Sequence, residues 1–200
     1  LRPEGTAPVM RSYLQHHLEQ KGGVQKLYYI GPCFRAERPQ KGRYRQFHQF
    51  GLEVIGASDA RADAETIACA ADIYQALGIN DYRLRINSLG DENSRPRYKE
   101  ALIAFLKPLE DELSEVSRGR LESNPLRILD TKNEKERQLL SDAPILIDFI
   151  DDESRAHYEA VKVHLTAIGI AFEEDPFLVR GLDYYSRTSF EFESDVLGAQ

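Results

Sequence analysis

The chain has 200 residues, of which 42% are hydrophobic and 30% charged, and it carries a formal net charge of −7. That length allows one sizeable core, or one core with a small insertion, and the composition is typical of a globular protein. The acidity excludes a protein that coats nucleic acid over its whole surface, so any such contact must be local. Two cysteines, Cys33 and Cys69, are too few for a disulfide framework and favour a reducing cytoplasm. No apolar run is as long as a membrane helix, so no membrane partner is expected.

Residues 1–23 predict a loop followed by a helix. Proline and glycine in the opening LRPEGT favour turns, Thr6 is suited to cap the helix, and Pro8 fits its first turn. Arg2, Glu4 and Thr6 stand at this junction, either as caps with a surface ion pair or as ligand contacts. One face of the helix, which ends at paired glycines, is apolar and carries Val9, Met10, Tyr13, Leu14 and Leu18.

A β-hairpin is predicted next, from strands at residues 28–34 and 47–55. Side chains in each strand alternate between two faces. One face of the second strand is mostly apolar and is expected to face the core, with His48, Phe50, Leu52 and Val54. The opposite face carries Gln49 and Glu53. These two residues form either the solvent-exposed face of a half-exposed antiparallel strand or the floor of a polar pocket.

The loop between these strands is basic. Its single acid is Glu37, and its five cations, which leave a local charge of +4, are Arg35, Arg38, Lys41, Arg43 and Arg45. A solvated turn does not need such an excess of positive charge, whereas a phosphate ligand does. We therefore expect this loop to contact phosphate groups.

The rest of the chain changes from sheet-like to helical and back. A helix is predicted over residues 59–77 and a strand over 82–88, and the C-terminal residues return to strands. The intervening residues are mostly helical, with one clear helix over 154–168. The expected domains are a first core part at 1–88 with the hairpin at 28–56, a mostly helical insertion at 89–171, and a second core part at 172–200.

The C-terminal part contains the polar stretch VRGLDYYSRT, which includes Arg180, Tyr184 and Tyr185. The glycine after Arg180 lets a ligand approach the backbone closely. Paired tyrosines beside arginine and aspartate suit a small-molecule pocket. Taken alone, the same residues also fit a hairpin with a surface ion pair.

The sequence lacks the motifs of several common chemistries. It has no Walker loop, no dinucleotide-binding glycine motif and no nucleophile elbow. What remains is a set of cations and carboxylates, among them Arg35, Arg180, Glu4 and Glu53. Such a set suits the positioning of two substrates and the stabilisation of negative charge at a phosphorus centre. A planar guanidinium matches a phosphate or a carboxylate.

Four features together resemble the histidyl-tRNA synthetases, a family of class II aminoacyl-tRNA synthetases. They are LRPEGT at 1–6, FRAERPQKGRYRQFHQFGLEVIG at 34–56, the placement of the insertion, and LVRGLDYYSRT at 178–188. The second is similar to class II motif 2, and the last is similar to the histidine-specific signature of this family. The resemblance implies an α+β fold in which a class II antiparallel sheet is flanked by helices and interrupted by a mostly helical insertion.

The resemblance also implies a ligase that activates L-histidine with ATP and transfers it to tRNA(His). Mg²⁺ is implied to accompany ATP, with no metal site in the protein, and the enzyme is implied to be a cytoplasmic homodimer. The motif 1, motif 3 and anticodon-binding domain of the family are not found in these 200 residues. We therefore expect these residues alone to be inactive.

Site residues follow from the resemblance position by position. Arg35 and Arg180 are the implied catalytic cations, which stabilise the α-phosphate. Histidine binding is implied for Glu4, Thr6, Arg35, Gln49, Glu53, Arg180, Tyr184 and Tyr185. ATP binding is implied for Arg35, Glu37, Arg43 and Phe47, with Phe47 stacked on adenine. Contacts with tRNA are implied for Arg38, Lys41, Arg43 and Arg45.

Two other interpretations stay open at this point. A catalytically silent relative, such as a regulatory subunit of ATP phosphoribosyltransferase, keeps the fold but can lose pocket residues, which are present here. A plain RNA-binding module uses the basic loop, but it leaves Gln49, Glu53 and the segment around Arg180 without a function.

Overall fold

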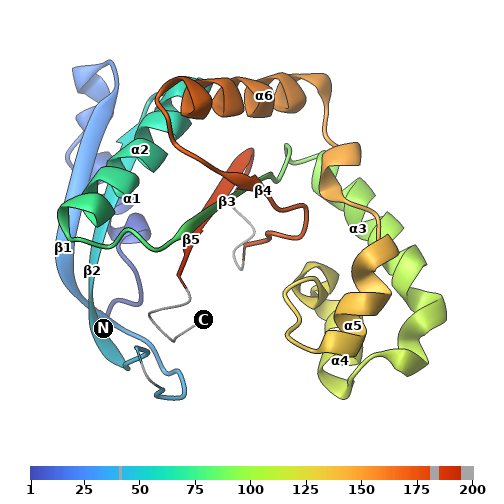
Figure 1. The fold of residues 1–200 in the computed structure, drawn as a ribbon. Coiled ribbons are helices and arrows are strands. Elements are labelled where there is room, and N and C mark those ends of the chain that lie inside the picture. Colours follow the sequence, from blue (N-terminus) through green and yellow to red (C-terminus); the bar gives the residue numbers. More distant parts are fainter. Residues whose placement is uncertain (41, 181–184, 195–200) are drawn as a thin grey trace. The chain divides into compact units, whose positions relative to one another are not determined.

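The computed structural model describes residues 1–40, 42–180 and 185–194. They fold into two compact units, the first of Leu1–Tyr82 with Ser194 and the second of Arg83–Glu193. Both units combine helices with β-strands (Figure 1), which confirms the predicted α+β class. Within the described ranges, none of the helices combines the length and the apolarity that a membrane crossing requires.

The first unit contains a two-stranded sheet. Its elements are α1 (Thr6–Gln15), a 3₁₀ turn (Leu18–Lys21), β1 (Gln25–Phe34), β2 (Gln46–Ile55) and α2 (Ala60–Ala76). The strands pair antiparallel, from Gln25 opposite Ile55 to Phe34 opposite Gln46, which confirms the predicted hairpin. Both strands begin earlier than predicted.

The start and the end of α1 differ from the prediction. The N-cap residue is Gly5 and not Thr6. The first turn is capped by the Glu4 carboxylate, which accepts hydrogen bonds from the backbone N–H groups of Thr6 at 2.6 Å and Ala7 at 3.0 Å. The helix ends at Gln15, before the paired glycines Gly22 and Gly23 where its end was predicted, because His17 adopts a left-handed backbone with φ of 51° that no α-helix continues.

The two faces of the hairpin are covered in the opposite way to the prediction. Phe50, expected to face the core, is 46% exposed, and its neighbours on β1 are more so, with Tyr28 at 74% and Ile30 at 68%. The other face is the covered one, and Cys33 on it is completely buried. The reason is that the opening loop packs on this second face, where Gly5 lies against the ring of Tyr29.

The second unit contains a three-stranded sheet in the order β4-β3-β5. The strands are β3 (Arg83–Ser88), β4 (Glu173–Glu174) and β5 (Thr188–Glu193). β3 pairs antiparallel with β5 and parallel with β4, as Figure 1 shows. The α-helices are α3 (Ser94–Leu106), α4 (Glu115–Ser123), α5 (Glu134–Leu139) and α6 (Asp152–Ala167). The 3₁₀ turns are Lys107–Glu112, Pro125–Ile128, Leu140–Asp142 and Leu146–Asp148.

An apolar core holds the helices after β3 together. It is built around buried side chains of α3 and includes Tyr98, Leu102, Leu106, Leu121, Ile128 and Leu146. The hydroxyl of Tyr158 on α6 donates to the carbonyl of Ile86 at 3.3 Å, which fastens that helix to β3. The strands and the helical residues thus share one compact unit, and the predicted three-part division at 88/89 and 171/172 stays a prediction.

Candidate functional site

One side of the β1–β2 hairpin carries four of the predicted site residues, Arg35, Phe47, Gln49 and Glu53. Its cross-strand pairs are Leu27 with Glu53, Tyr29 with Gly51, Gly31 with Gln49, and Cys33 with Phe47. Because side chains alternate along a strand, all of these point to the same side, and Arg35 follows them just beyond β1. We call this surface the polar face.

At one end of the polar face, α1 contacts β2. The Thr6 hydroxyl donates to Glu53 Oε1 at 2.7 Å, and the Glu4 carboxylate lies beside them at the start of α1. Burial raises the pKa of Glu53, the hydrogen bond from Thr6 opposes this, and the negative charge of Glu4 adds to the rise. Two neighbouring carboxylates in a partly buried site favour a cationic ligand, such as an ammonium or an imidazolium.

At the other end of the polar face, Arg35 lies over the ring of Phe47, with 4.9 Å from its Cζ to the ring centroid. Arg35 Nε donates to the carbonyl of Pro3 at 2.9 Å, and its backbone N–H donates to the carbonyl of Arg45 at 2.9 Å. A guanidinium fixed through Nε still presents a planar pair of terminal nitrogens. This geometry matches a phosphate or a carboxylate.

Tyr29 belongs to the polar face although sequence reasoning did not assign it a role. A Cβ atom added at Gly51 would lie 2.2 Å from Tyr29 Cζ, and one at Gly5 would lie 2.1 Å from its ring. Both positions therefore need glycine for the ring to lie where it does. Burial raises the pKa of Tyr29, and the charge of Glu53 raises it further. The signal in the sequence is Gly51, which lies opposite Tyr29 once the register is known.

Gln49 occupies the middle of the polar face. Its Oε1 accepts a weak hydrogen bond from the Cys33 thiol, with 3.5 Å between the atoms, so the carboxamide oxygen is turned toward β1. A Cβ atom at Gly31, opposite Gln49, would lie 2.1 Å from Arg2 Nη2. This glycine therefore lets Arg2 cross the sheet next to Gln49.

In the basic loop, the single acidic residue, Glu37, interacts with two of the arginines. Glu37 Oε2 lies 3.6 Å from Arg43 Nε, and the carbonyl of Glu37 accepts from Arg45 Nε at 3.2 Å. Arg38, Arg43 and Arg45 are exposed, and Lys41 lies outside the described residues. Exposed guanidinium groups of this kind suit phosphate contacts, which stay a prediction for this loop.

Two predicted site residues are described in the second unit. Arg180 donates through Nη2 to the carbonyl of Phe190, and its Nη1 lies 3.4 Å from Glu191 Oε2. Arg180 is therefore held against β5 within its own unit. Tyr185 is 39% exposed. Tyr184, predicted to contact histidine, lies outside the described residues.

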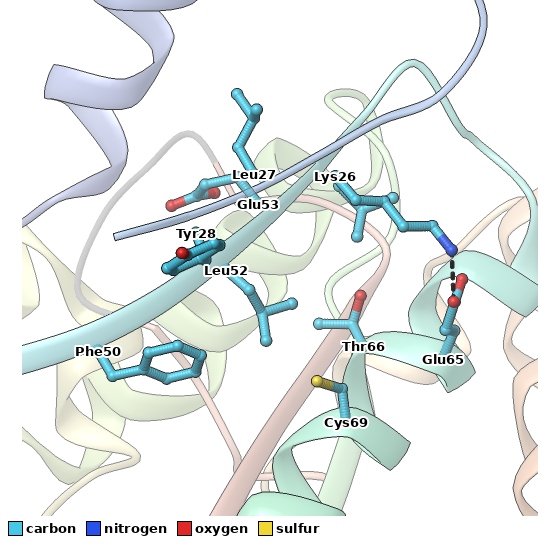
Figure 2. A pocket seen from close by; sticks show the side chains of 10 residues that line it. Lys26, Leu27, Tyr28, Phe50, Leu52, Glu53, Glu65, Thr66 and Cys69 are labelled. Atoms are coloured by element: carbon cyan, nitrogen blue, oxygen red, sulfur yellow. Dashed lines mark hydrogen bonds and ion pairs between the residues drawn. The ribbon is translucent and has the colours of Figure 1, made fainter. Parts of the chain in front are cut away.

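A cavity of about 420 Å³ opens on the other side of the hairpin, between the sheet and α2. Figure 2 shows its mostly apolar lining, with Phe50 and Leu52 from β2 and Thr66 and Cys69 from α2. An ion pair between Lys26 and Glu65 lies at one side. Of the predicted site residues, Glu53 alone borders this cavity among those described. Apart from Glu53, the predicted site residues described in the first unit therefore do not line this cavity.

No group of three or more His, Cys, Asp or Glu side chains in the described part of the chain is placed to hold a metal ion. Glu53 on the polar face and Glu4 beside it are both engaged with the start of α1. Among the described residues, the donor set therefore does not fit a resident metal ion. The charged groups available to an anionic ligand on this face are guanidinium groups.

Comparison with known proteins identifies the relatives of the chain. The family model described as Histidyl-tRNA synthetase matches residues 1–197. The histidine–tRNA ligase of Thermosynechococcus vestitus is 54% identical over 198 residues, which cover 99% of this chain and 46% of that protein. The one of Rippkaea orientalis is 52% identical over 200 residues, which cover 100% and 47%. The chain thus spans about half the length of the curated relatives it matches.

Solved structures agree with this assignment. The apo histidyl-tRNA synthetase of S. aureus aligns with a TM-score of 0.72 at 44% identity, covering 96% of this chain and 45% of that one. A protein from Bacillus halodurans described as an ATP phosphoribosyltransferase regulatory subunit/histidyl-tRNA synthetase aligns with a TM-score of 0.59 at 22% identity, covering 100% and 55%. This second likeness is one of fold alone. Since the family model matches nearly the whole chain, and relatives at over half identity and a shared class II fold agree with it, the chain belongs to the histidyl-tRNA synthetase family.

Proposed function

We propose that the protein containing this chain is a histidine–tRNA ligase. It would activate L-histidine with ATP to histidyl-adenylate and transfer the histidyl group to tRNA(His). The observation that carries this proposal is the presence, on one face of the hairpin, of the carboxylates Glu4 and Glu53 at one end and the Arg35 guanidinium at the other. A zwitterionic amino acid with a basic side chain needs both signs of charge in its site.

Histidine would bind along the polar face. Glu4, Thr6 and Gln49 would hold the α-amino group, and Glu53 and Tyr185 would bind the imidazole nitrogens, with Tyr184 beside them. The partly buried Glu53 carboxylate, which already accepts a hydrogen bond from Thr6, supports a role in binding a positively charged or hydrogen-bonding ring. Tyr29 would form a wall of the same site.

ATP would bind toward the other end of the polar face. Phe47 would stack on adenine, Glu37 would lie near the adenine amino group, and Arg43 near the γ-phosphate. Arg35 would contact the α-phosphate and the histidine carboxylate. The contact between Arg35 and Phe47 supports this arrangement, because it holds a cation next to the expected stacking surface. Mg²⁺ would accompany ATP.

The chemical step would be a displacement at phosphorus. A carboxylate oxygen of histidine would attack the α-phosphorus of ATP, and the bond to the bridging oxygen of the β-phosphate would break, which releases pyrophosphate. Negative charge on the α-phosphate oxygens grows during this step, and Arg35 and Arg180 would stabilise it. No side chain needs to form a covalent bond.

The transfer step would involve the basic loop. Arg38, Lys41, Arg43 and Arg45 would contact phosphates at the acceptor end of tRNA(His), where such contacts position the RNA without reading its sequence. The helical residues 89–171 would act as an insertion near the acceptor stem. A homodimer and a cytoplasmic location also follow from the proposed function and stay predictions.

The direct test is histidine-dependent ATP–pyrophosphate exchange by the complete protein, followed by charging of tRNA(His). We expect exchange with L-histidine and not with other amino acids. Glu53→Gln should lower kcat/KM for histidine by roughly 10- to 100-fold, because the ligand loses a charged partner in a partly buried site. Glu65→Gln, a change of the same kind at the exposed partner of Lys26, should have an effect of less than about twofold. Absence of exchange, with a related ligase active in the same assay, would refute the proposed function.

A further inference from the structure

Asn87 is a buried residue of β3 that no step of the proposed function uses. It is 3% exposed, and its carboxamide is fully engaged. Nδ2 donates to the carbonyl of Pro176 at 3.2 Å and to the carbonyl of Leu178 at 3.1 Å, and Oδ1 accepts from the backbone N–H of Ser88 at 2.8 Å. The side chain therefore joins β3 to a turn far along the chain, and this turn leads directly into Arg180.

The turn that Asn87 holds is itself well defined. The backbone N–H of Leu178 donates to the carbonyl of Asp175 at 3.0 Å, and that of Phe177 donates to Asp175 Oδ1 at 3.0 Å. Asp175 is tied to β3 as well, because its other carboxylate oxygen lies 3.1 Å from Arg85 Nη1. Arg85 and Asn87 alternate with Ile86 and thus lie on one face of β3. Two side chains of the same strand fasten the turn.

The other end of the segment 178–188 is bonded to the residues that directly follow β3. The backbone N–H of Arg187 donates to the carbonyl of Gly90 at 2.8 Å, and the carbonyl of Arg187 accepts from Leu89 at 2.6 Å. Arg187 adopts φ of 54°, a strained conformation for a residue with a side chain. Its guanidinium pairs with Glu153 at 2.5 Å and lies 3.2 Å from His157 Nδ1. Both ends of the segment are therefore fixed next to β3.

We propose that Asn87 is a positioning residue for Arg180, and through it for the reaction. This inference rests on the proposed function, in which Arg180 stabilises the α-phosphate. Leu178 is 8% exposed and is held by Asn87, so the backbone two residues before Arg180 has a fixed position. Without the Asn87 carboxamide, the buried carbonyl of Leu178 and the partly buried carbonyl of Pro176 lose their donor, and the turn relaxes. Arg180 is then displaced from the position in which it can meet a developing negative charge.

The test compares Asn87→Ser with Leu102→Ala in the complete protein. Leu102 is completely buried in the core of the same unit and has no assigned role in the proposed function. Both changes should lower the melting temperature. Asn87→Ser should lower kcat for ATP–pyrophosphate exchange by about tenfold or more and leave the KM for ATP within about twofold, because the lost interaction acts in the transition state. Leu102→Ala should change kcat by less than about twofold.

A double-mutant cycle separates positioning from general weakening. In an Arg180→Ala background, Asn87→Ser should lower kcat by less than about twofold, since the group on which it acts is gone. If the two losses instead multiply, or if Asn87→Ser matches Leu102→Ala in both stability and kcat, the proposal is wrong. Should Asn87→Ser fail to fold, Arg85→Lys loosens the same turn at a half-exposed position and should show the same pattern at smaller size.

Amide hydrogen exchange gives a readout that does not depend on activity. Asn87→Ser should accelerate exchange at Phe177 and Leu178 by about tenfold or more relative to Leu102→Ala. If the wild-type protein catalysed no histidine-dependent reaction, the proposed function would fail while this measurement still decided whether Asn87 fixes the turn. Unchanged protection at these amides would overturn the positioning role even in an active enzyme.

Discussion

The hydroxyl of Thr6 donates to the carboxylate of Glu53 at 2.7 Å, which connects the first residue of α1 to β2 across 47 positions of sequence. The bond stabilises the charged form of Glu53, whereas burial and the nearby Glu4 disfavour that form. The protonation state of Glu53 therefore depends on two opposing effects. The hydrogen bond from Thr6 favours the carboxylate, whereas burial and the charge of Glu4 favour the protonated acid. Glu53 is the residue proposed to bind the imidazole ring, so this balance should be visible in histidine binding.

Thr6→Val removes the hydroxyl and keeps the shape of the side chain. The pKa of Glu53 should then rise further, because the interaction that opposes burial is lost. We expect histidine to bind about tenfold more weakly near neutral pH. The fall in histidine affinity at acidic pH should also begin at a higher pH than in the wild type. Calorimetric titrations across pH measure both effects. Thr66→Val is the matched control, because the hydroxyl of Thr66 donates to the carbonyl of Ala62 on α2. It should leave the pH dependence of histidine binding unchanged.

Glu53 should also lower the stability of the ligand-free protein at neutral pH. Its pKa lies above the ordinary value of 4.5, so the native state binds this proton more tightly than the unfolded state does. The stability that comes from this difference is present below pH 4.5 and is lost as pH rises through the raised pKa. Glu53→Gln should therefore be more stable than the wild type in urea at neutral pH. The two proteins should converge below pH 4.5. A variant less stable than the wild type at neutral pH would contradict this prediction.

The alternation of side chains is sufficient to predict the strands of the hairpin. It is not sufficient to predict which face of the hairpin other segments cover. Alternation along β1 and β2 correctly predicted a hairpin with Gln49 and Glu53 on one side. It also predicted that Phe50 faces the core, which is wrong within the described residues, because the opening loop packs on the other side. Which face of a two-stranded sheet is covered depends on a distant segment, and strand periodicity carries no information about it.

The contacts that define the candidate site were harder to foresee than its residues. Thr6 is a good N-cap by type, yet Glu4 caps α1 and Thr6 turns to Glu53, a choice that depends on where β2 lies. Tyr29 is an ordinary strand aromatic by residue type, and only the strand register shows that Gly51 lies opposite it. Asn87 could not be recognised at all, since its partners are backbone carbonyls that any sequence supplies.

Gly51→Ala tests whether the ring of Tyr29 shapes the polar face. The added Cβ atom would lie 2.2 Å from Tyr29 Cζ, so the ring must move. We expect a loss of roughly 1–3 kcal/mol in stability together with weaker histidine binding. Gly119→Ala on α4 is the control, because nothing lies within 4 Å of a Cβ atom there. It should instead stabilise the protein by about 0.5–1 kcal/mol. Equal effects of the two changes in chemical denaturation would show that Tyr29 is not held by Gly51.

The second unit has an acid-sensitive carboxylate of its own. Glu136 on α5 is 1% exposed, and it accepts hydrogen bonds from the Ser114 backbone N–H at 2.7 Å and from the Thr131 hydroxyl. Burial raises the pKa of Glu136, but these hydrogen bonds outweigh it and lower the pKa to about 2. Because the native pKa lies below the ordinary value of 4.5, the stabilisation is complete above pH 4.5 and is lost as pH falls toward about 2.

Glu136→Gln should therefore destabilise the protein by about 3 kcal/mol at neutral pH, and the difference from the wild type should shrink steadily as the pH is lowered from 4.5. Denaturant unfolding of both proteins at a series of pH values measures this difference. Glu112→Gln, at an exposed carboxylate of the same unit, should change stability by less than about 0.5 kcal/mol at every pH. The contrary outcome is a difference in unfolding free energy between Glu136→Gln and the wild type that is the same at every pH. That result would show that packing and neutral hydrogen bonds of Glu136 stabilise the protein, and not the charge of its carboxylate.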